Sequence, residues 1–120
     1  MSTYDFTINQ GTDLTVPLVL KNGDGSLIQL GGFDCRMQMR RSKGAHSLVD
    51  DLTVKNGRIV IDVNKARISL MFPHEVTASY PPVNLVYDIE LVSASGQVTR
   101  ILEGNIEVSA EVTKDDFCSC

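Results

Sequence analysis

Residues Asn84 to Thr113 read NLVYDIELVSASGQVTRILEGNIEVSAEVT, and this stretch decides the fold. It holds two runs rich in β-forming residues, joined by residues 94–96, whose small side chains suit a hairpin turn. In the first run, every second residue from Leu85 to Leu91 is apolar, and Asp88 and Glu90 fall between them. This period of two is typical of a strand with one buried face. The stretch therefore predicts a long β-hairpin.

The returning run is longer and less regular than the first. Its apolar phase includes Leu102 and Val108, whereas Arg100 and Ile101 break the alternation. Gly104 lies in the middle of the run. We interpret these features as a bulge or bend that lets one strand pair with two neighbours. A hairpin of this length has to cover a core, so other segments must supply the opposing face.

Further strands are predicted where apolar and polar residues alternate between turn signals such as Asn22-Gly23-Asp24-Gly25. We expect them at residues 4–8, 13–21, 27–30, 33–41, 58–63 and 68–72, and the run 48–54 leads into the Asn56-Gly57 turn. Pro17 has no amide hydrogen to donate, so its strand is expected at a sheet edge or bulged. Residues 73–80 form the only predicted helix, because Pro73 suits a helix start.

Seven or eight short strands with regular turns predict an all-β chain. We expect a single antiparallel Ig-like β-sandwich with one short helix, and a small barrel is the alternative. On the strand at 33–41, Cys35, Met37 and Met39 should face inward, and Arg36, Gln38 and Arg40 should face outward. The core is predicted to contain Leu18, Met37, Ile61, Leu70, Tyr87, Ile89 and Val108.

The composition fits one globular domain. Of the 120 residues, 42% are hydrophobic and 22% are charged, which is typical of a globular chain of one domain. The strand pattern places the sandwich domain at residues 1–113, and residues 114–120, which fall outside the pattern, are expected to form a C-terminal tail. The net charge is −4 and the basic residues form no long run, so we expect no nucleic-acid partner. No apolar run reaches membrane-spanning length, and residues 2–5 lack the basic start of a signal peptide, so no membrane partner is expected. The three cysteines, an odd number, favour assembly in a reducing cytosol.

The sequence predicts no enzyme, no cofactor and no metal. His46 and His74 have no spacing that ties either of them to a nucleophile. Cys35 falls on an apolar face, where a structural thiol is expected. Cys118 and Cys120 offer two thiolates, but a tetrahedral metal site needs more ligands and none lies nearby in the sequence.

The order of motifs resembles that of a known family of small proteins. These motifs are F-x-I-x-Q-G at residues 6–11, N-G-D-G at 22–25, G-G-F-x-C-R-M-Q-M-R at 31–40, V-Y-D-I-E-L at 86–91 and S-G-x-V-T-R-I-L-E-G-x-I-x-V at 95–108. This order is similar to that of the β-sandwich proteins of the bacteriophage tail collar and baseplate, some of which anchor tail fibres. The resemblance covers residues 4–113 and implies a non-enzymatic virion protein, made in the host cytoplasm. It transfers no catalytic residue.

Two classes of function follow from the sequence. The first is a structural phage tail protein, with a capsid decoration protein as a near alternative. The second is a carbohydrate- or receptor-binding module, which the shortage of aromatic residues disfavours. For the first class we expect a ring-shaped homo-oligomer that also contacts other tail proteins or fibres. The candidate partner interface comprises Tyr4, Phe6, Ile8, Arg36, Gln38, Arg40 and Phe117, because a first strand with an open edge and an outward basic row suit contacts between copies.

Overall fold

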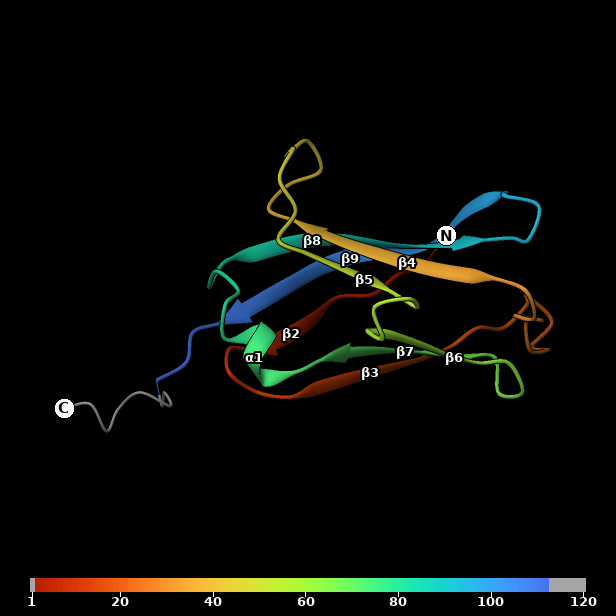
Figure 1. Cartoon of the computed structure of the whole chain (residues 1–120), viewed down its shortest axis with the longest axis horizontal. Coiled ribbons are helices and arrows are strands. Elements are labelled where there is room, and N and C mark those ends of the chain that lie inside the picture. The colour runs from red at the N-terminus through yellow and green to blue at the C-terminus, as the bar shows by residue number, and fades with distance from the viewer. Residues whose placement is uncertain (1, 113–120) are drawn as a thin grey trace.

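The computed structural model describes residues 2–112, which form two β-sheets packed face to face (Figure 1). The six-stranded sheet contains β1 (Ser2–Thr3), β2 (Phe6–Asn9), β4 (Asp34–Arg40), β5 (Asp50–Thr53), β8 (Asn84–Val92) and β9 (Val98–Ser109). The three-stranded sheet contains β3 (Leu14–Val19), β6 (Ile59–Asp62) and β7 (Arg67–Phe72). The helix α1 (His74–Thr77) lies at one end of the sandwich. The predicted Ig-like sandwich with one short helix is confirmed.

The central hairpin is formed by β8 and β9, as predicted. Ile89 lies opposite Leu102 and Glu90 lies opposite Arg100, so Ile101 is the extra residue of a bulge. The strand β9 pairs with β8 on one side and with β1 and β2 on the other. The predicted bulge and the two-sided pairing of this strand are therefore both present.

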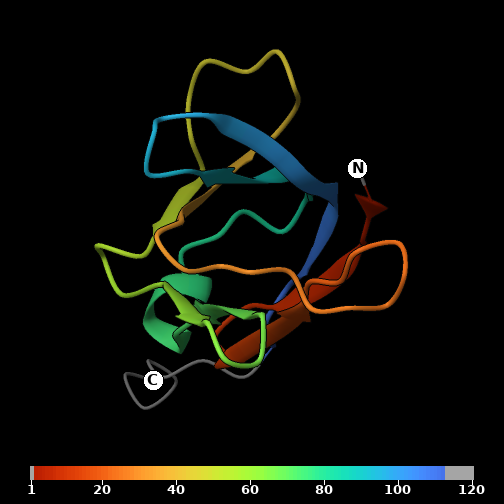
Figure 2. The same ribbon diagram turned by 90° about the vertical axis from the view of Figure 1, so that its right-hand side faces the viewer.

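The N-terminal strands differ from the antiparallel expectation. Both β1 and β2 pair in parallel with β9. The chain leaves β2 for β3 in the other sheet, so no hairpin connects β2 to its partner (Figure 2). A hairpin turn in the sequence indicates that the two strands it joins are antiparallel. No such turn joins β2 to β9, so the local sequence does not indicate the direction in which they pair.

The core lies between the two sheets, where the predicted inward residues meet. Met37, Leu70 and Ile89 are fully buried, and Tyr87 and Val108 nearly so. Leu18 and Ile61 are partly buried and pack against this core. Cys35, Met37 and Met39 all face inward, which confirms the predicted phase of β4. Burying each large apolar side chain contributes about 1.5–3 kcal/mol.

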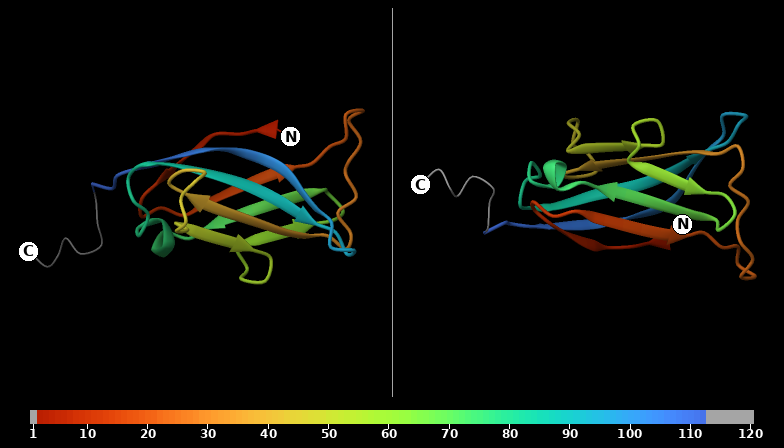
Figure 3. Two further views of the ribbon diagram at one scale, coloured as in Figure 1. Left: turned by 90° about the horizontal axis from the view of Figure 1, so that it is seen from above. Right: turned by 60° about the horizontal axis from the view of Figure 1, so that its bottom comes forward.

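The predicted strand at residues 27–30 is not formed. Only Leu27 makes an isolated bridge, to Lys21. Residues 20–33 cross from one sheet to the other at the end opposite α1 (Figure 3). Leu30 is nonetheless buried in the core. The apolar residues of this segment thus reflect packing of a crossing loop rather than strand pairing. No helix within residues 2–112 is long and apolar enough to span a bilayer.

Candidate functional site

β1 and β2 form one edge of the six-stranded sheet. The Tyr4 N–H donates to the Glu103 carbonyl at 2.9 Å, and the Gln10 N–H donates to the Ser109 carbonyl at 2.9 Å. Successive residues of a strand direct their main-chain groups to opposite sides. The main-chain N–H and C=O groups of the even-numbered residues in this segment therefore point toward β9.

The odd-numbered residues Thr3, Asp5 and Thr7 direct their main-chain N–H and C=O groups away from β9. Within residues 2–112, no strand pairs with this side. Asp5 is the single charged residue of the segment, and its carboxylate accepts a hydrogen bond from the Asn105 N–H at 2.8 Å. The Asp5 carboxylate is therefore bound to the sheet and does not protect the open edge with its charge. The edge is open to the main chain of another strand.

Gly104 determines how the N-terminal segment crosses β9. Tyr87 lies opposite Gly104, and its hydroxyl donates to the carbonyl of Tyr4. A Cβ atom at position 104 would lie 2.0 Å from that carbonyl oxygen, so only glycine leaves room. The Asn105 N–H, which a regular parallel ladder would pair with the same carbonyl, binds the Asp5 carboxylate instead. The tyrosine thus replaces one rung of the ladder and separates β1 from β2. Burial, followed by the charge of Asp5, raises the pKa of Tyr87, so the hydroxyl remains a donor.

The first three predicted interface residues have unequal positions. Tyr4 is 44% exposed, and its ring stacks on Phe6 at 5.7 Å. Phe6 is half-buried and its ring also contacts Phe72, in the opposite sheet, at 6.0 Å. Ile8 is fully buried, and its main chain faces β9. Ile8 therefore supports the strand from the core, and the exposed ring at this edge belongs to Tyr4.

The outward row of β4 is placed as predicted, but its arginines have different partners. The Arg36 Nε donates to Glu90 at 2.8 Å, so this arginine pairs within the sheet. Arg40 donates to the carbonyls of residues 45 and 46, at 3.1 and 2.9 Å, and to Gln38 at 3.1 Å. Arg40 thereby holds the loop at residues 41–48, which rises above the outer face of the six-stranded sheet (Figure 1).

A hollow of about 330 Å³ lies on this outer face and includes residues of β1, β4, β8, β9 and the loop in its lining. Two carboxylates, Glu103 and Asp88, are directly opposite each other in it. Arg100 lies between them, with its Nε 3.3 Å from Asp88 and its Nη1 3.8 Å from Glu103. The Lys43 ammonium lies 3.7 Å from Glu103. Together with Arg40, the cations of the hollow outnumber its carboxylates.

The residues considered for catalysis or metal binding do not come together in the described part of the chain. His46 is exposed on the loop, and His74 contacts the carboxylates of Asp13 and Glu75 at 3.0 Å each. Burial raises the pKa of the Cys35 thiol to about 12. No group of three His, Cys, Asp or Glu side chains within residues 2–112 is arranged to hold a metal ion. Phe117, Cys118, Cys120 and the predicted tail at 114–120 lie outside the described residues.

One polar cluster was not predicted from the sequence. Arg58 donates to Asp50 at 2.8 Å and to the Met71 carbonyl at 2.7 Å, and Tyr80 donates its hydroxyl to Asp50. Burial, with a further effect of Asp50, raises the pKa of Tyr80. The Arg58 and Asp50 side chains are only 15% and 17% exposed, so the cluster ties the two sheets together. Its members are far apart in sequence and share no motif that would identify them.

Comparison with known proteins identifies no family. No family model and no curated protein matches the chain. Among solved structures, the chain is similar to the crystal structure of CopC from Methylosinus trichosporium OB3b, with 13% identity and a TM-score of 0.48 over 90% of this chain and 86% of that chain. At this identity and TM-score, nothing about ligands or activity passes from CopC to this chain.

The expected phage function is corrected by these findings. No family model and no curated protein connects the chain to a bacteriophage, and the solved structure named above is a CopC rather than a virion protein. The order of motifs that suggested a tail protein consists of strands and turns, which any small sandwich needs. The resemblance of the motifs therefore indicates the fold and does not indicate that the protein belongs to a virus particle. The alternatives of a capsid decoration protein and a carbohydrate-binding module gain no support either.

Proposed function

We propose that this protein is a non-catalytic module that associates with further copies of itself through the open edge of β1 and β2. The observation that carries the proposal is the row of outward main-chain groups at Thr3, Asp5 and Thr7, which no strand within residues 2–112 covers. Unpaired strand edges recruit extended chains by main-chain hydrogen bonding. A second copy offers the same edge, so two copies can pair about a two-fold axis.

The contrast between this edge and the β3 edge of the three-stranded sheet supports the choice. β3 is also an edge strand, but it contains Pro17. The Leu20 N–H donates to the Ala66 carbonyl, so the alternation of the antiparallel ladder turns position 17 outward. The missing amide hydrogen of Pro17 therefore lies on the open side and blocks strand addition there. β1 and β2 have no equivalent protection.

Sedimentation velocity at high ionic strength, where exposed ionic contacts are screened, tests the proposal over a range of protein concentrations. The wild-type protein should form dimers as its concentration rises. Thr7→Lys places a charge on the open edge without removing a bond to β9, and this variant should remain monomeric. Thr15→Lys, at an exposed position of β3, is the matched control and should dimerise like the wild type. Equal association of the Thr7→Lys variant and the wild type would refute the role of the edge, and a wild type that stays monomeric at every concentration would refute self-association.

A further inference from the structure

The hollow on the outer face of the six-stranded sheet contains more cations than carboxylates, although the whole chain has a net charge of −4. Arg40, Lys43 and Arg100 line it together with Asp88 and Glu103, and Arg36 lies beside it on the same face. The Lys43–Glu103 and Arg100–Glu103 separations, 3.7 and 3.8 Å, exceed those of direct charge-assisted hydrogen bonds. The Arg36–Glu90 pair, at 2.8 Å, is by contrast tight.

The hollow is therefore a preformed cavity whose cations are loosely paired. The loop at residues 41–48 lies beside the hollow, and Arg40 fixes this loop by donating hydrogen bonds to two of its carbonyls. The position of the loop therefore does not depend on Lys43. Lys43 is 80% exposed and Arg100 is 48% exposed, so both can turn toward an incoming anion. A volume of about 330 Å³ is at the small end of binding pockets, which suits a side chain on a narrow turn.

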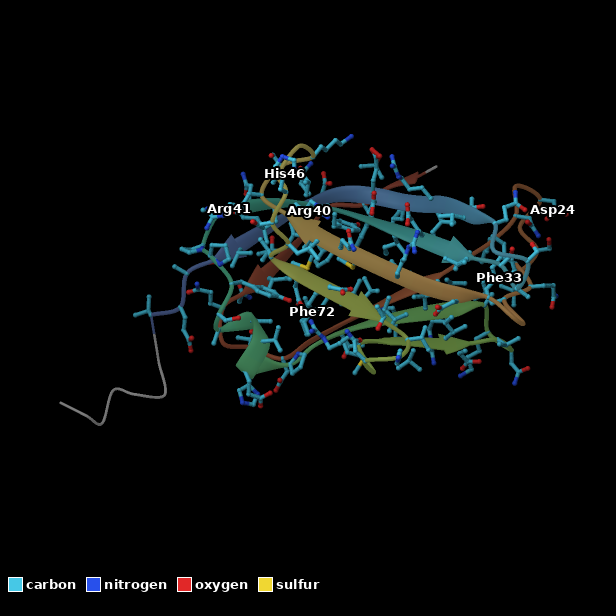
Figure 4. The ribbon with its side chains drawn as sticks, turned by 45° about the horizontal axis from the view of Figure 1, so that its top comes forward. Asp24, Phe33, Arg40, Arg41, His46 and Phe72 are labelled. Carbon is cyan, nitrogen blue, oxygen red and sulfur yellow. The ribbon has the colours of Figure 1, made fainter. Side chains whose placement is uncertain are left out.

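A matching turn lies at one end of the molecule. Residues 22–25 form a tight turn in which the Gly25 N–H donates to the Asn22 carbonyl at 3.0 Å, and Asp24 is its one charged side chain. Added Cβ atoms at Gly23 and Gly25 would meet nothing within 4 Å, so the tip protrudes. Asp24 lies at one end of the long axis, and Arg40, Arg41 and His46 lie toward the other (Figure 4).

One carboxylate oxygen of Asp24 is held in place and the other is available. Its Oδ1 accepts bonds from the Ser26 hydroxyl at 2.6 Å and from the Ser26 N–H at 2.9 Å. Those hydrogen bonds lower the pKa of Asp24, so the turn is negatively charged at neutral pH. The turn therefore presents a fixed carboxylate on a convex tip.

We infer that the hollow on the outer face binds the Asp24 turn of a second copy, in a head-to-tail contact between Asp24 and the cations Lys43 and Arg100. This inference rests on the proposed self-association and names a second contact for it. The contact is heterologous, because the turn and the hollow are different surfaces of the molecule. It extends dimers formed through the open edge into larger assemblies, since each dimer exposes two turns and two hollows.

Two charge-reversal variants test the contact. Lys43→Glu makes the hollow acidic and leaves the turn intact, whereas Asp24→Lys does the opposite. Both sites are exposed, so neither substitution disturbs the core, and Asp24→Asn is the milder variant that keeps an acceptor for Ser26. Lys55→Glu, on the exposed turn before β6, is the matched control. Sedimentation velocity at low ionic strength, where exposed charges are least screened, measures the assembly size.

We expect the wild type and the Lys55→Glu variant to grow beyond the dimer. The Lys43→Glu, Asp24→Lys and Asp24→Asn variants should each stop at the dimer. A mixture of the Lys43→Glu and Asp24→Lys variants should grow again, because intact turns of one variant meet intact hollows of the other.

Growth of either single variant, or a mixture that remains dimeric, would overturn the head-to-tail contact while leaving the edge pairing in place. A wild type that never exceeds the dimer would also overturn the inference.

Discussion

At the scale of single residues, Gly104 controls the course of the N-terminal segment. A methyl group there would lie 2.0 Å from the Tyr4 carbonyl oxygen, and a main-chain atom cannot rotate away. Gly104→Ala should therefore displace the segment and lower the free energy of unfolding by about 1–3 kcal/mol, the usual cost of overpacking. Urea denaturation measures the change. Gly44→Ala is the control, because an added Cβ at Gly44 meets nothing within 4 Å, and it should stay within about 0.5 kcal/mol of the wild type. A Gly104→Ala variant as stable as the control would mean that the close approach is not real.

Asp13 is one residue through which stability should depend on pH. Its carboxylate accepts a hydrogen bond from the His74 main-chain N–H at 2.7 Å and one from the ring, and these bonds lower the pKa of Asp13 below 3.8. A carboxyl group whose pKa is lower in the folded state stabilises the fold at pH values above its pKa in the unfolded chain. This contribution disappears as the pH falls through its pKa in the folded state.

The Asp13→Asn variant should accordingly melt below the wild type at about pH 5, and the difference should shrink as the pH falls toward about 2.5. Calorimetric melting between these pH values measures it. Glu75→Gln is the control for the second carboxylate beside His74, because Glu75 contacts only the ring. A melting difference for Asp13→Asn that is constant with pH would show that the carboxylate charge is not responsible.

At the scale of elements, the Arg58 cluster connects β5, β7 and the segment after α1. Removing Arg58 leaves the Asp50 carboxylate, 17% exposed, without its cation, so Arg58→Ala should lower the free energy of unfolding by about 3 kcal/mol. Arg36→Ala is a matched comparison. The Arg36–Glu90 pair has the same 2.8 Å separation but Arg36 is 50% exposed, so its loss should cost about 1 kcal/mol or less. Equal losses in chemical denaturation would show that burial does not set the difference.

The strands were largely predictable from sequence because a buried face imposes a period of two. Cys35, Met37 and Met39 show this on β4, and the broken phase at Arg100 and Ile101 identified the bulge of β9. Pro17 correctly indicated an edge strand. These features are local, so the sequence records them directly.

What the sequence did not reveal depends on contacts between distant segments. The parallel pairing of β2 with β9 joins residues about a hundred positions apart, without a turn to signal it. The hydroxyl of Tyr87 and the space left by Gly104 act together only once β1, β8 and β9 are assembled. Ile8 was assigned to a partner interface because its strand was expected at an edge. Its side chain instead fills the core, since the strand covers the second sheet.

At the scale of the whole molecule, the sandwich has an open edge at β1 and β2 and opposite charges at two separate places. We propose that the open edge at Thr3–Thr7 pairs two copies and that the hollow beneath the loop at 41–48 binds the turn of a further copy. The edge contact consists of main-chain hydrogen bonds and should persist at high salt. The contact of Asp24 with the hollow is ionic and exposed, and it should weaken as salt is added.

Amide hydrogen exchange at individual residues tests the central claim of edge pairing most directly. The Tyr4 N–H already donates to β9, so it should be protected at every protein concentration. The Asp5 and Thr7 N–H groups point to the open side and should exchange rapidly in dilute solution. Pairing with a second copy predicts that Asp5 and Thr7 become protected as the concentration rises, and that Thr7→Lys abolishes the effect. Rapid exchange of Asp5 and Thr7 in a sample that sedimentation shows to be fully associated would contradict the account.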